Sequence, residues 1–279
     1  MNKAVISEII KIGLIEDINN IDVTTDNLIS EMSTCKATLT VKEDGVISGL
    51  DIARQVFKTL DSNIKTIFFV KDGAGVEKGD KLFEIEGKTK AILKGERLAL
   101  NIIQRMSGIS TQASKYAKLV EGINVKIVDT RKTTPGLRIL EKYAVKAGGC
   151  FNHRYNLSDA VMIKDNHIKA ACGITNAVKK IKENISIATK IEVEVQTIDQ
   201  LKEALEAKVD IIMLDNMSVA MMKEAVEIAN GEVLLEASGC ITKDNLVEVA
   251  KTGVNIISVG ALTHSVKTLD ISLNIDEMY

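Results

Sequence analysis

Positive charge is concentrated in one part of this chain, around the stretch DTRKTTPGLR at residues 129–138. From Asp129 to Lys169 the sequence holds eight lysines or arginines against four aspartates or glutamates, although the formal net charge of the chain is -2. Guanidinium and ammonium groups at this density favour the binding of carboxylate or phosphate groups. The sequence therefore predicts a local anion site rather than a basic surface.

Two motifs in the same region carry further side chains that suit an anion site. FNHRYN places His153 beside Arg154, and VMIKDN places Lys164 within an apolar run. A histidine next to an arginine is a candidate anion ligand. Lys164 has two interpretations: a nucleophile that forms a Schiff base with a carbonyl substrate, or a charged ligand for an acidic substrate. His167 is interpreted as structural.

Six apolar, β-branched runs end in the remaining candidate residues. The runs are KIVDT (126–130), AVMIKDN (160–166), IEVEVQT (191–197), DIIMLDN (210–216), EVLLEASG (232–239) and NIISVGAL (255–262). Such runs, each followed by an amphipathic pattern, are typical of parallel strands in an α/β barrel, where catalytic residues follow the carboxyl ends of the strands. Glu194 and Asp215 are such residues. Ser238 and Gly260 end the last two runs, where barrels often bind phosphate.

These runs predict an α/β protein with two domains. Residues 109–264 are expected to form an incomplete α/β barrel of six or seven parallel strands. Residues 1–108 are expected to form a smaller α+β domain, with the tail 265–279 packed on it. In that domain, glycine-separated β-rich runs lie at 35–49, 65–73 and 81–93, and helical patterns at 3–13, 51–60 and 95–120.

The only proline of the chain lies within the basic stretch and predicts a helix start. Thr134 as N-cap and Pro135 at the first helical position would begin a helix that Gly148 ends. Arg131 and Lys132 would then lie just before the free N–H groups of that helix. Because such groups also attract anions, the helix would strengthen the anion site.

Charge and cysteine content argue against several other classes of protein. A net charge of -2 and a pI of about 6.0 do not favour binding of nucleic acid or of anionic lipid. Cys35, Cys150, Cys172 and Cys240 are widely spaced without a CxxC pair, which argues against a zinc site and a disulfide framework. No apolar run approaches the length of a membrane span. A reducing, cytoplasmic location is expected.

Long motifs of the chain resemble one enzyme family. They are EDINNIDVTTD, ERLALNIIQRMSGIST, DTRKTTPGLRILEKYAVKAGGCFNHRYNLSDAVMIKDNHI, LLEASGCI and VGALTHS. In this order they are similar to the quinolinate phosphoribosyltransferases, also called nicotinate-nucleotide pyrophosphorylases (carboxylating), over nearly the whole chain. Cys150 and Cys240 depart from the family's pattern, which usually has glycine at both positions.

The resemblance implies a pentosyltransferase of NAD biosynthesis. Quinolinate and phosphoribosyl pyrophosphate would give nicotinate mononucleotide, pyrophosphate and carbon dioxide, with Mg²⁺ as cofactor. By the family's pattern, quinolinate would be bound by Arg97, Arg131, His153, Arg154 and Lys164. Catalytic roles fall to Lys132, which would face the pyrophosphate, and to Glu194 and Asp215, which would face the ribose and its metal. Ser238, Gly239 and Gly260 would bind the 5-phosphate.

The resemblance also implies a homodimer with shared active sites. In the family, each site takes a basic residue from the small domain of a second subunit, and Arg97 in GERLALN occupies that place. Higher oligomers remain open.

Three other functions are compatible with the residues. A related phosphoribosyltransferase could use another acidic aromatic base, and a Schiff-base lyase would use Lys164. The stretch GAGVEKGDKLFEIEGKTKAIL at 73–93 resembles hairpins of biotinyl and lipoyl carrier domains, although no lysine there lies in a convincing hairpin tip.

Overall fold

The computed structural model describes residues 1–279, which divide into two compact units. The first contains Met1–Ser114, Thr133–Gly149 and Ser265–Tyr279, and the second contains Lys115–Lys132 and Cys150–His264. The chain therefore leaves the second unit after the basic residues Arg131 and Lys132 and returns at Cys150. The sequence predicts one barrel domain over 109–264, whereas the structure assigns 109–114 and 133–149 to the first unit.

The first unit combines a four-stranded antiparallel sheet with helices. The sheet has the order β12-β1-β5-β3, so that the C-terminal strand pairs with the first strand of the chain. Its helices are α1 (Lys3–Ile18), α2 (Thr25–Leu28), α3 (Leu50–Leu60), α4 (Thr89–Leu119, whose last turn enters the second unit) and α5 (Arg138–Ala147). Its strands are β1 (Thr34–Val41), β2 (Gly45–Val46), β3 (Lys65–Phe68), β4 (Gly75–Val76), β5 (Lys81–Lys88) and β12 (Ile271–Met278).

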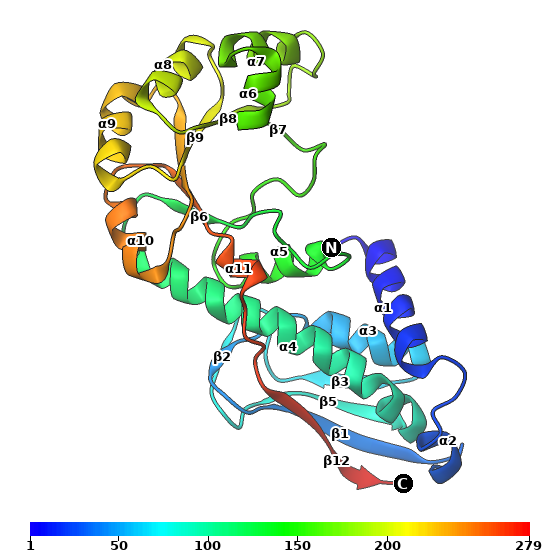
Figure 1. The fold of residues 1–279 in the computed structure, drawn as a ribbon. Coiled ribbons are helices and arrows are strands. Elements are labelled where there is room, and N and C mark those ends of the chain that lie inside the picture. Colours follow the sequence, from blue (N-terminus) through cyan, green and yellow to red (C-terminus); the bar gives the residue numbers. More distant parts are fainter. The chain divides into compact units, whose positions relative to one another are not determined.

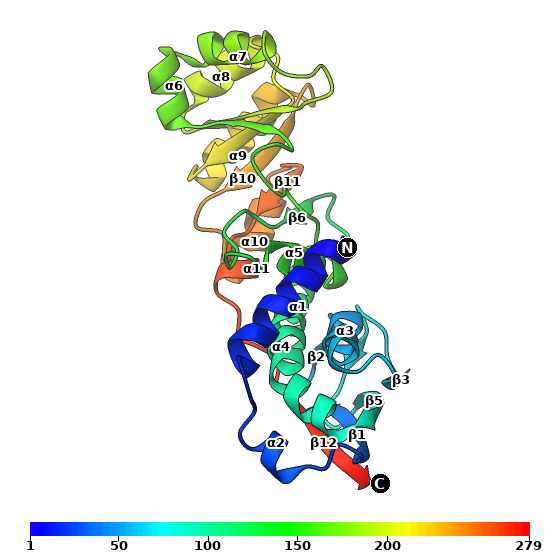
Figure 2. The ribbon, with the colours of Figure 1, turned by 90° about the vertical axis from the view of Figure 1, so that its right-hand side faces the viewer.

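Helix α4 is the long helix of the first unit in both views of the ribbon, and α1 approaches it at Gly13, where a Cβ would lie 2.5 Å from Leu98 Cδ1 (Figures 1 and 2). Two glycines allow other segments to approach α4 closely. A Cβ at Gly108 would lie 2.3 Å from the carbonyl oxygen of Lys267, and one at Gly148 would lie 2.3 Å from that of Ser110. Gly148 also ends α5, as the sequence predicts. These contacts fix the tail and α5 against the long helix.

The start of α5 differs from the sequence prediction. The helix begins at Arg138 with Leu137 as N-cap, not at Thr134. The Leu137 N–H donates to the Thr134 carbonyl at 3.1 Å, and Gly136 has a φ of 81°. Pro135 followed by glycine in the left-handed region is typical of a type II turn. The Pro135–Gly136 pair thus forms a turn, and no helix N-terminus directly follows Lys132.

The second unit contains six parallel strands in one sheet, with the order β6-β11-β10-β9-β8-β7. These are β6 (Lys126–Val128), β7 (Val161–Ile163), β8 (Ile191–Val195), β9 (Ile211–Asp215), β10 (Leu234–Ser238) and β11 (Ile256–Ser258). The helices are α6 (Asp165–Ala171), α7 (Ile174–Lys182), α8 (Ile198–Glu206), α9 (Val219–Ala229), α10 (Lys243–Ala250) and α11 (Ala261–His264). Because β6 and β7 do not pair, the barrel is incomplete, as predicted, and it has six strands.

Alternation along these strands separates an apolar face from a polar one. Val193, Ile212 and Ile257 point to the helix-covered side and are fully buried, with 0% exposure. Helices α8, α9 and α10 lie along that side of the strand layer (Figure 1). Neighbouring positions on the same strands point to the opposite face, since successive side chains alternate. There the strands carry carboxylates and hydroxyls, including Glu194 and Ser258.

Side-chain caps fix where the covering helices begin. The Thr197 hydroxyl accepts from the N–H of Gln200 at the start of α8, and the Ser218 hydroxyl accepts from the N–H of Met221 at the start of α9. Such caps satisfy N–H groups that lack a partner within the helix. Each cap begins its helix a few residues after the preceding strand. The loops that follow the carboxyl ends of β8 and β9 are therefore short.

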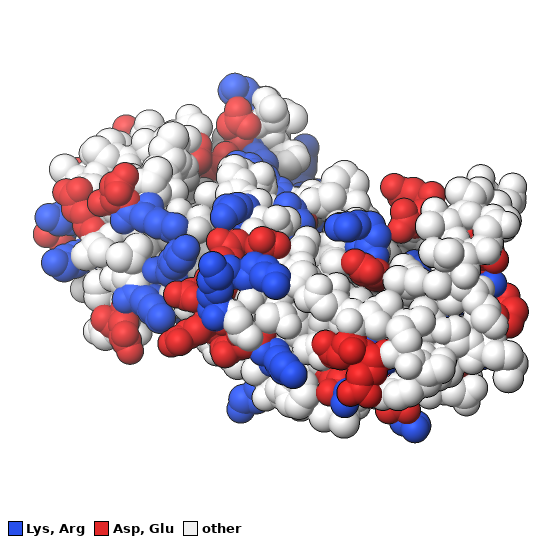
Figure 3. Space-filling view, turned by 90° about the horizontal axis from the view of Figure 1, so that it is seen from below, with Lys and Arg blue, Asp and Glu red and all other residues white.

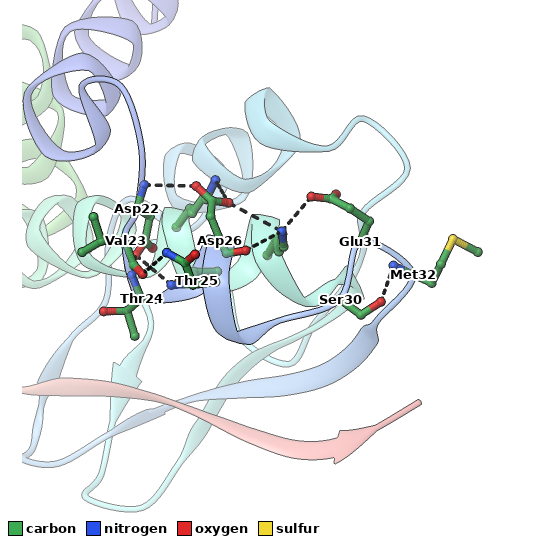
Figure 4. A network of polar contacts seen from close by, with 11 residues as sticks. Asp22, Val23, Thr24, Thr25, Asp26, Ser30, Glu31 and Met32 are labelled. Carbon is green, nitrogen blue, oxygen red and sulfur yellow. Dashed lines mark hydrogen bonds and ion pairs between the residues drawn. The ribbon is translucent and has the colours of Figure 1, made fainter.

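The last five residues of the motif EDINNIDVTTD, at 22–26, form a compact turn in the first unit (Figure 4). The Asp22 carboxylate accepts from the N–H groups of Thr24 at 3.0 Å and Thr25 at 2.9 Å. The Asp26 carboxylate accepts from the Asp22 N–H at 3.1 Å and pairs with Lys94 on α4 at 2.6 Å. These bonds tie the turn to the long helix.

The surface charges agree with the nearly neutral composition. On the face seen in Figure 3, acidic and basic side chains lie beside one another in small groups. None of the helices combines the length and the apolar character that crossing a membrane requires.

Candidate active site

A cavity of about 430 Å³ opens in the second unit, where the carboxyl ends of its strands meet. Volumes of this size are usual for small-molecule sites. Its lining combines cations, carboxylates and hydroxyls: Asp129, Thr130, Arg131, Lys132, His153, Arg154, Met162, Lys164, Glu194, Met213, Asp215, Glu236, Ser238 and Ser258.

The cationic residues of the cavity are held by neighbouring polar groups. The Arg154 guanidinium donates to the Ala160 carbonyl at 2.9 Å and to the Met162 sulfur at 3.5 Å. Burial and the nearby charge of Arg131 lower the pKa of Arg154. The main-chain N–H of Lys132 donates to the Thr130 hydroxyl at 3.1 Å. A cavity with these groups favours an anion, which would relieve the repulsion between the two guanidinium ions.

Two carboxylates at the ends of β8 and β9 face the same cavity. Glu194 Oε2 lies 2.5 Å from the Lys164 ammonium, and the Glu194 side chain is 13% exposed. Asp215 Oδ2 accepts from the side-chain amides of Gln196 at 3.3 Å and Asn216 at 3.0 Å. Both amides are neutral donors, and together they orient the Asp215 carboxylate.

Glycines make room at the ends of β10 and β11. Gly239 has a φ of 94°, and a Cβ there would lie 2.2 Å from Asn216 Oδ1. A side chain at Gly260 would lie 3.0 Å from the His264 ring and 3.4 Å from Lys132 Cδ. Cys240 follows with a φ of 49°, which is unfavourable for a residue with a side chain. The turn after Ser238 thus requires glycine at 239 and carries backbone strain at 240.

His153 lies between two buried carboxylates at the base of the cavity. Its Nε2 is 3.1 Å from Glu192 Oε2 and 3.2 Å from Glu236 Oε2, and the two glutamates are 2% and 0% exposed. Burial opposes the charged ring, but the hydrogen bonds and charges of both glutamates outweigh it and raise the pKa of His153 to about 10. Burial raises the pKa of Glu192 as well. Glu236 Oε1 and Oε2 and Glu192 Oε1 lack a well-aligned hydrogen-bond partner.

The structure brings most of the sequence-predicted site residues together. Those that line the one cavity are Arg131, Lys132, His153, Arg154, Lys164, Glu194, Asp215 and Ser238. Gly239 and Gly260 lie beside Asn216 and Lys132 at the ends of their strands. Arg97 belongs to α4 in the first unit, and its role stays a prediction. His167 is structural, since its Nδ1 accepts the Lys164 N–H at 3.0 Å.

Sequence reasoning missed several residues of the site. Gln196 lies two positions after Glu194, so the alternation of β8 could have indicated that it faces the same way. Ser258 ends β11 and could have been found by the same reasoning. Met162 and Met213 gave no signal, because a methionine within an apolar run is indistinguishable from a core residue.

The carboxylates at the cavity fit a hard divalent cation. Mg²⁺ prefers oxygen ligands and is usually held by one or two carboxylates together with substrate phosphates. Both amide hydrogen bonds to Asp215 go to Oδ2, which leaves Oδ1 for a cation. Lys164 contacts Oε2 of Glu194, so that the other oxygen is the one suited to a metal.

Known proteins resemble the chain over its whole length. Residues 22–107 match the model of the quinolinate phosphoribosyl transferase N-terminal domain, and residues 109–274 match that of the C-terminal domain. A probable nicotinate-nucleotide pyrophosphorylase (carboxylating) of Bacillus subtilis is 43% identical over 99% of this chain and 95% of its own length. A similar protein of Methanocaldococcus jannaschii is 41% identical, with 96% of each chain covered.

Solved structures agree with these sequence matches. The NadC structure from Streptococcus pyogenes superposes with a TM-score of 0.95 at 37% identity, covering 99% of both chains. The nicotinate-nucleotide pyrophosphorylase from Francisella tularensis gives 0.94 at 41% identity, covering 99% of this chain and 98% of its own. With both domain models matched in order and relatives above 40% identity across the chain, this protein belongs to the quinolinate phosphoribosyltransferase family.

Proposed function

We propose that the chain converts quinolinate and phosphoribosyl pyrophosphate into nicotinate mononucleotide, pyrophosphate and carbon dioxide. One observation supports this most strongly: three cationic side chains for a dianion and two carboxylates for a developing cation line the same cavity. The cations are Arg131, Arg154 and Lys164, and the carboxylates are Glu194 and Asp215. A site for a single carboxylate would not need so many cations.

The cationic residues would bind the two carboxylates of quinolinate. The Arg154 guanidinium is anchored to the Ala160 carbonyl, so the orientation of its other N–H groups toward an incoming carboxylate is fixed. Lys164 pairs with Glu194 in the substrate-free protein, and a substrate carboxylate would compete for the same ammonium. Binding therefore exchanges one ion pair for another, and it frees Glu194 to act on the ribose.

The carboxylates would stabilise the transfer step. As pyrophosphate leaves C1 of the ribose, the sugar gains oxocarbenium character, which Glu194 and Asp215 can stabilise as preorganised negative charges. Lys132 would neutralise the departing pyrophosphate. The pyridine nitrogen of quinolinate then forms the new bond to C1, with its lone pair as nucleophile. The protein contributes position and charge rather than a covalent intermediate.

Loss of carbon dioxide needs no further cofactor. Alkylation makes the ring nitrogen positive, so it stabilises the electron pair left on C2 when the adjacent carboxylate departs. Protonation of that carbon by water completes nicotinate mononucleotide. The remaining carboxylate keeps its cationic ligands throughout.

Mg²⁺ is proposed as the cofactor, held by Asp215 and Glu194 together with the substrate. When bound, it would neutralise negative charge on the pyrophosphate group. We place the reaction in the cytoplasm, because all four cysteines are free thiols, which fits a reducing compartment.

A homodimer with shared sites is proposed as the active form. Arg97 lies in the first unit, far in sequence from the residues of the cavity, and the family resemblance assigns it to the site of a second subunit. A basic residue supplied in this way would complete the set of quinolinate ligands.

A Schiff-base lyase is less well supported. Lys164 forms an ion pair with the Glu194 carboxylate at 2.5 Å, and an ammonium group has no lone pair with which to attack a carbonyl.

Competition binding distinguishes a dicarboxylate site from a monocarboxylate site. Phthalate has both carboxylates but no ring nitrogen, and we expect it to compete with quinolinate without reacting. Nicotinate should bind roughly tenfold to a few hundredfold more weakly, because one cationic group would lose a charge-assisted hydrogen bond. If nicotinate binds as tightly as phthalate, or is converted at a comparable rate, the cavity is built for a monocarboxylate.

A further inference from the structure

The buried cluster of His153, Glu192 and Glu236 lies at the base of the cavity, and its glutamates have no part in the reaction above. Its three ligand-type atoms lie within 4.8 Å of one another. Such a cluster has two possible uses, as a metal site or as a support for the histidine ring. The contact of the second ring nitrogen distinguishes between them.

That nitrogen, His153 Nδ1, accepts a hydrogen bond from the main-chain N–H of Arg154 at 2.8 Å. A ring nitrogen that accepts a hydrogen bond carries no proton, so the proton of a neutral ring is on Nε2. A protonated Nε2 has no lone pair for a metal ion, and metal-binding histidines instead donate from their second nitrogen. The cluster is therefore arranged to hold the ring, with Nε2 between Glu192 Oε2 at 3.1 Å and Glu236 Oε2 at 3.2 Å.

The same contacts limit what the ring can bind. Its Nδ1 faces the Arg154 N–H at 2.8 Å, and its Nε2 faces Glu192 Oε2 at 3.1 Å and Glu236 Oε2 at 3.2 Å. Neither ring nitrogen is therefore directed at a substrate carboxylate.

The main chain around His153 is fixed as well. Asp129 is fully buried and accepts from the His153 N–H at 2.9 Å and from the Asn152 side-chain amide at 2.6 Å. Arg154 is thus held at two points, by its N–H on the ring and by its guanidinium on the Ala160 carbonyl. The His153 ring thus connects Glu192 and Glu236 to Arg154, which lines the cavity.

We propose that His153 is a positioning residue and not a ligand of the substrate: Glu192 and Glu236 hold its ring, and the ring holds Arg154, which binds a carboxylate. Both ring nitrogens face protein groups, and the side chain is only 13% exposed. This assigns His153 a role different from the one its family resemblance implies. The inference rests on the proposed function, since it concerns how the same cavity binds its dianion.

Nitrogen-15 NMR of the histidines tests the proposal without an activity assay. The chain has three histidines, and His153 can be assigned by the signal that His153→Gln removes. We expect both ring nitrogen signals of His153 to change little when phthalate is added, because neither nitrogen contacts the substrate. A large phthalate-induced shift of either ring nitrogen would overturn the proposal, because the ring would then bind a carboxylate itself.

Kinetics with matched variants of Glu236 test the positioning role. Glu236→Leu should raise the KM for quinolinate roughly tenfold or more, with a smaller change in kcat. This is the effect expected when one charge-assisted hydrogen bond, from Arg154 to the substrate carboxylate, loses its geometry. Glu236→Gln keeps hydrogen-bonding atoms of the same shape and should restore most of the affinity. Glu232→Leu makes the same chemical change at an exposed position just before β10 and should have no effect. An unchanged KM in Glu236→Leu would refute the proposed support. If that variant does not fold, the NMR result on the wild-type protein still decides.

Discussion

Polar partners hold the two carboxylates of the cavity in the substrate-free protein. Glu194 pairs with the Lys164 ammonium, and the side-chain amides of Gln196 and Asn216 orient Asp215. In the proposed reaction Lys164 exchanges Glu194 for a substrate carboxylate, whereas Asp215 keeps its orientation, so that its negative charge is preorganised for the ribose.

Removal of either carboxylate should lower turnover strongly. We expect Glu194→Gln and Asp215→Asn each to reduce kcat by roughly 10²-fold or more, the scale for the loss of a preorganised electrostatic group. Both substitutions keep the side-chain shape, so the fold should survive, as circular dichroism and thermal unfolding can verify. Near-normal turnover of both variants at saturating Mg²⁺ would show that these carboxylates do not face the reacting centre.

The sequence identified these residues because each follows an apolar run. Glu194 and Asp215 lie near the ends of two predicted runs that form the parallel strands β8 and β9. Because parallel strands have their carboxyl ends at the same edge of a sheet, the sequence already indicated that the two residues lie at the same edge. The hydrogen bonds of His153 could not be predicted, because they join a loop to β8 and β10, residues that are far apart in the sequence. Tertiary contacts of this kind leave no local pattern.

The strands of the barrel follow closely from the sequence. Two elements of the first unit differ from the prediction, each for a physical reason. All six predicted runs contain strands, each shorter than its run, and β7 and β11 cover less than half of theirs. The run at 81–93 was partly wrong: β5 ends at Lys88, and α4 already begins at Thr89. A strand that passes directly into a helix lacks the glycine or proline signal that would mark the boundary. Pro135 gave a misleading signal, because the same residue starts helices and tight turns.

A buried ion pair between α4 and α5 should be important for the stability of the first unit. Glu141 is fully buried and accepts from Arg105 at 3.0 Å and 2.8 Å, and from the Thr134 N–H at 3.2 Å. Glu141→Ala would leave the arginine without its partner and should lower the free energy of unfolding by about 3 kcal/mol. Urea unfolding measures this difference.

Glu31→Ala provides the control for this measurement. Glu31 pairs with Lys90 at 2.7 Å, but its side chain is 78% exposed. Solvent screens such a pair, so the variant should lose much less free energy of unfolding than Glu141→Ala. Equal losses in both variants would contradict the importance assigned to the buried pair.

At the scale of the whole molecule, the chain contains an anion site in one unit and a candidate partner residue in the other. The two-domain organisation was predictable, because β-rich runs separated by glycine give way to repeated strand-helix patterns. The crossing of 133–149 into the first unit was not, since α5 has the same amphipathic pattern as the barrel helices. Pattern alone does not say which core a helix covers.

Mixing of inactive variants tests whether sites are shared between subunits. Arg97→Ala combined with Lys164→Ala should recover part of the activity, because a mixed dimer would contain one site with both residues intact. Arg154→Ala combined with Lys164→Ala serves as the control: both residues belong to the second unit, so every site of the mixed dimer would lack one of them. Absence of recovery in the first mixture, after verified subunit exchange, would argue against a shared site.

The most direct test of the central claim measures the products from quinolinate labelled in the carboxylate at C2. With phosphoribosyl pyrophosphate and Mg²⁺ present, the account predicts that labelled carbon dioxide, nicotinate mononucleotide and pyrophosphate form in equal amounts, and that none forms without phosphoribosyl pyrophosphate. Release of labelled carbon dioxide without the nucleotide, or formation of a nucleotide that keeps the label, would contradict it.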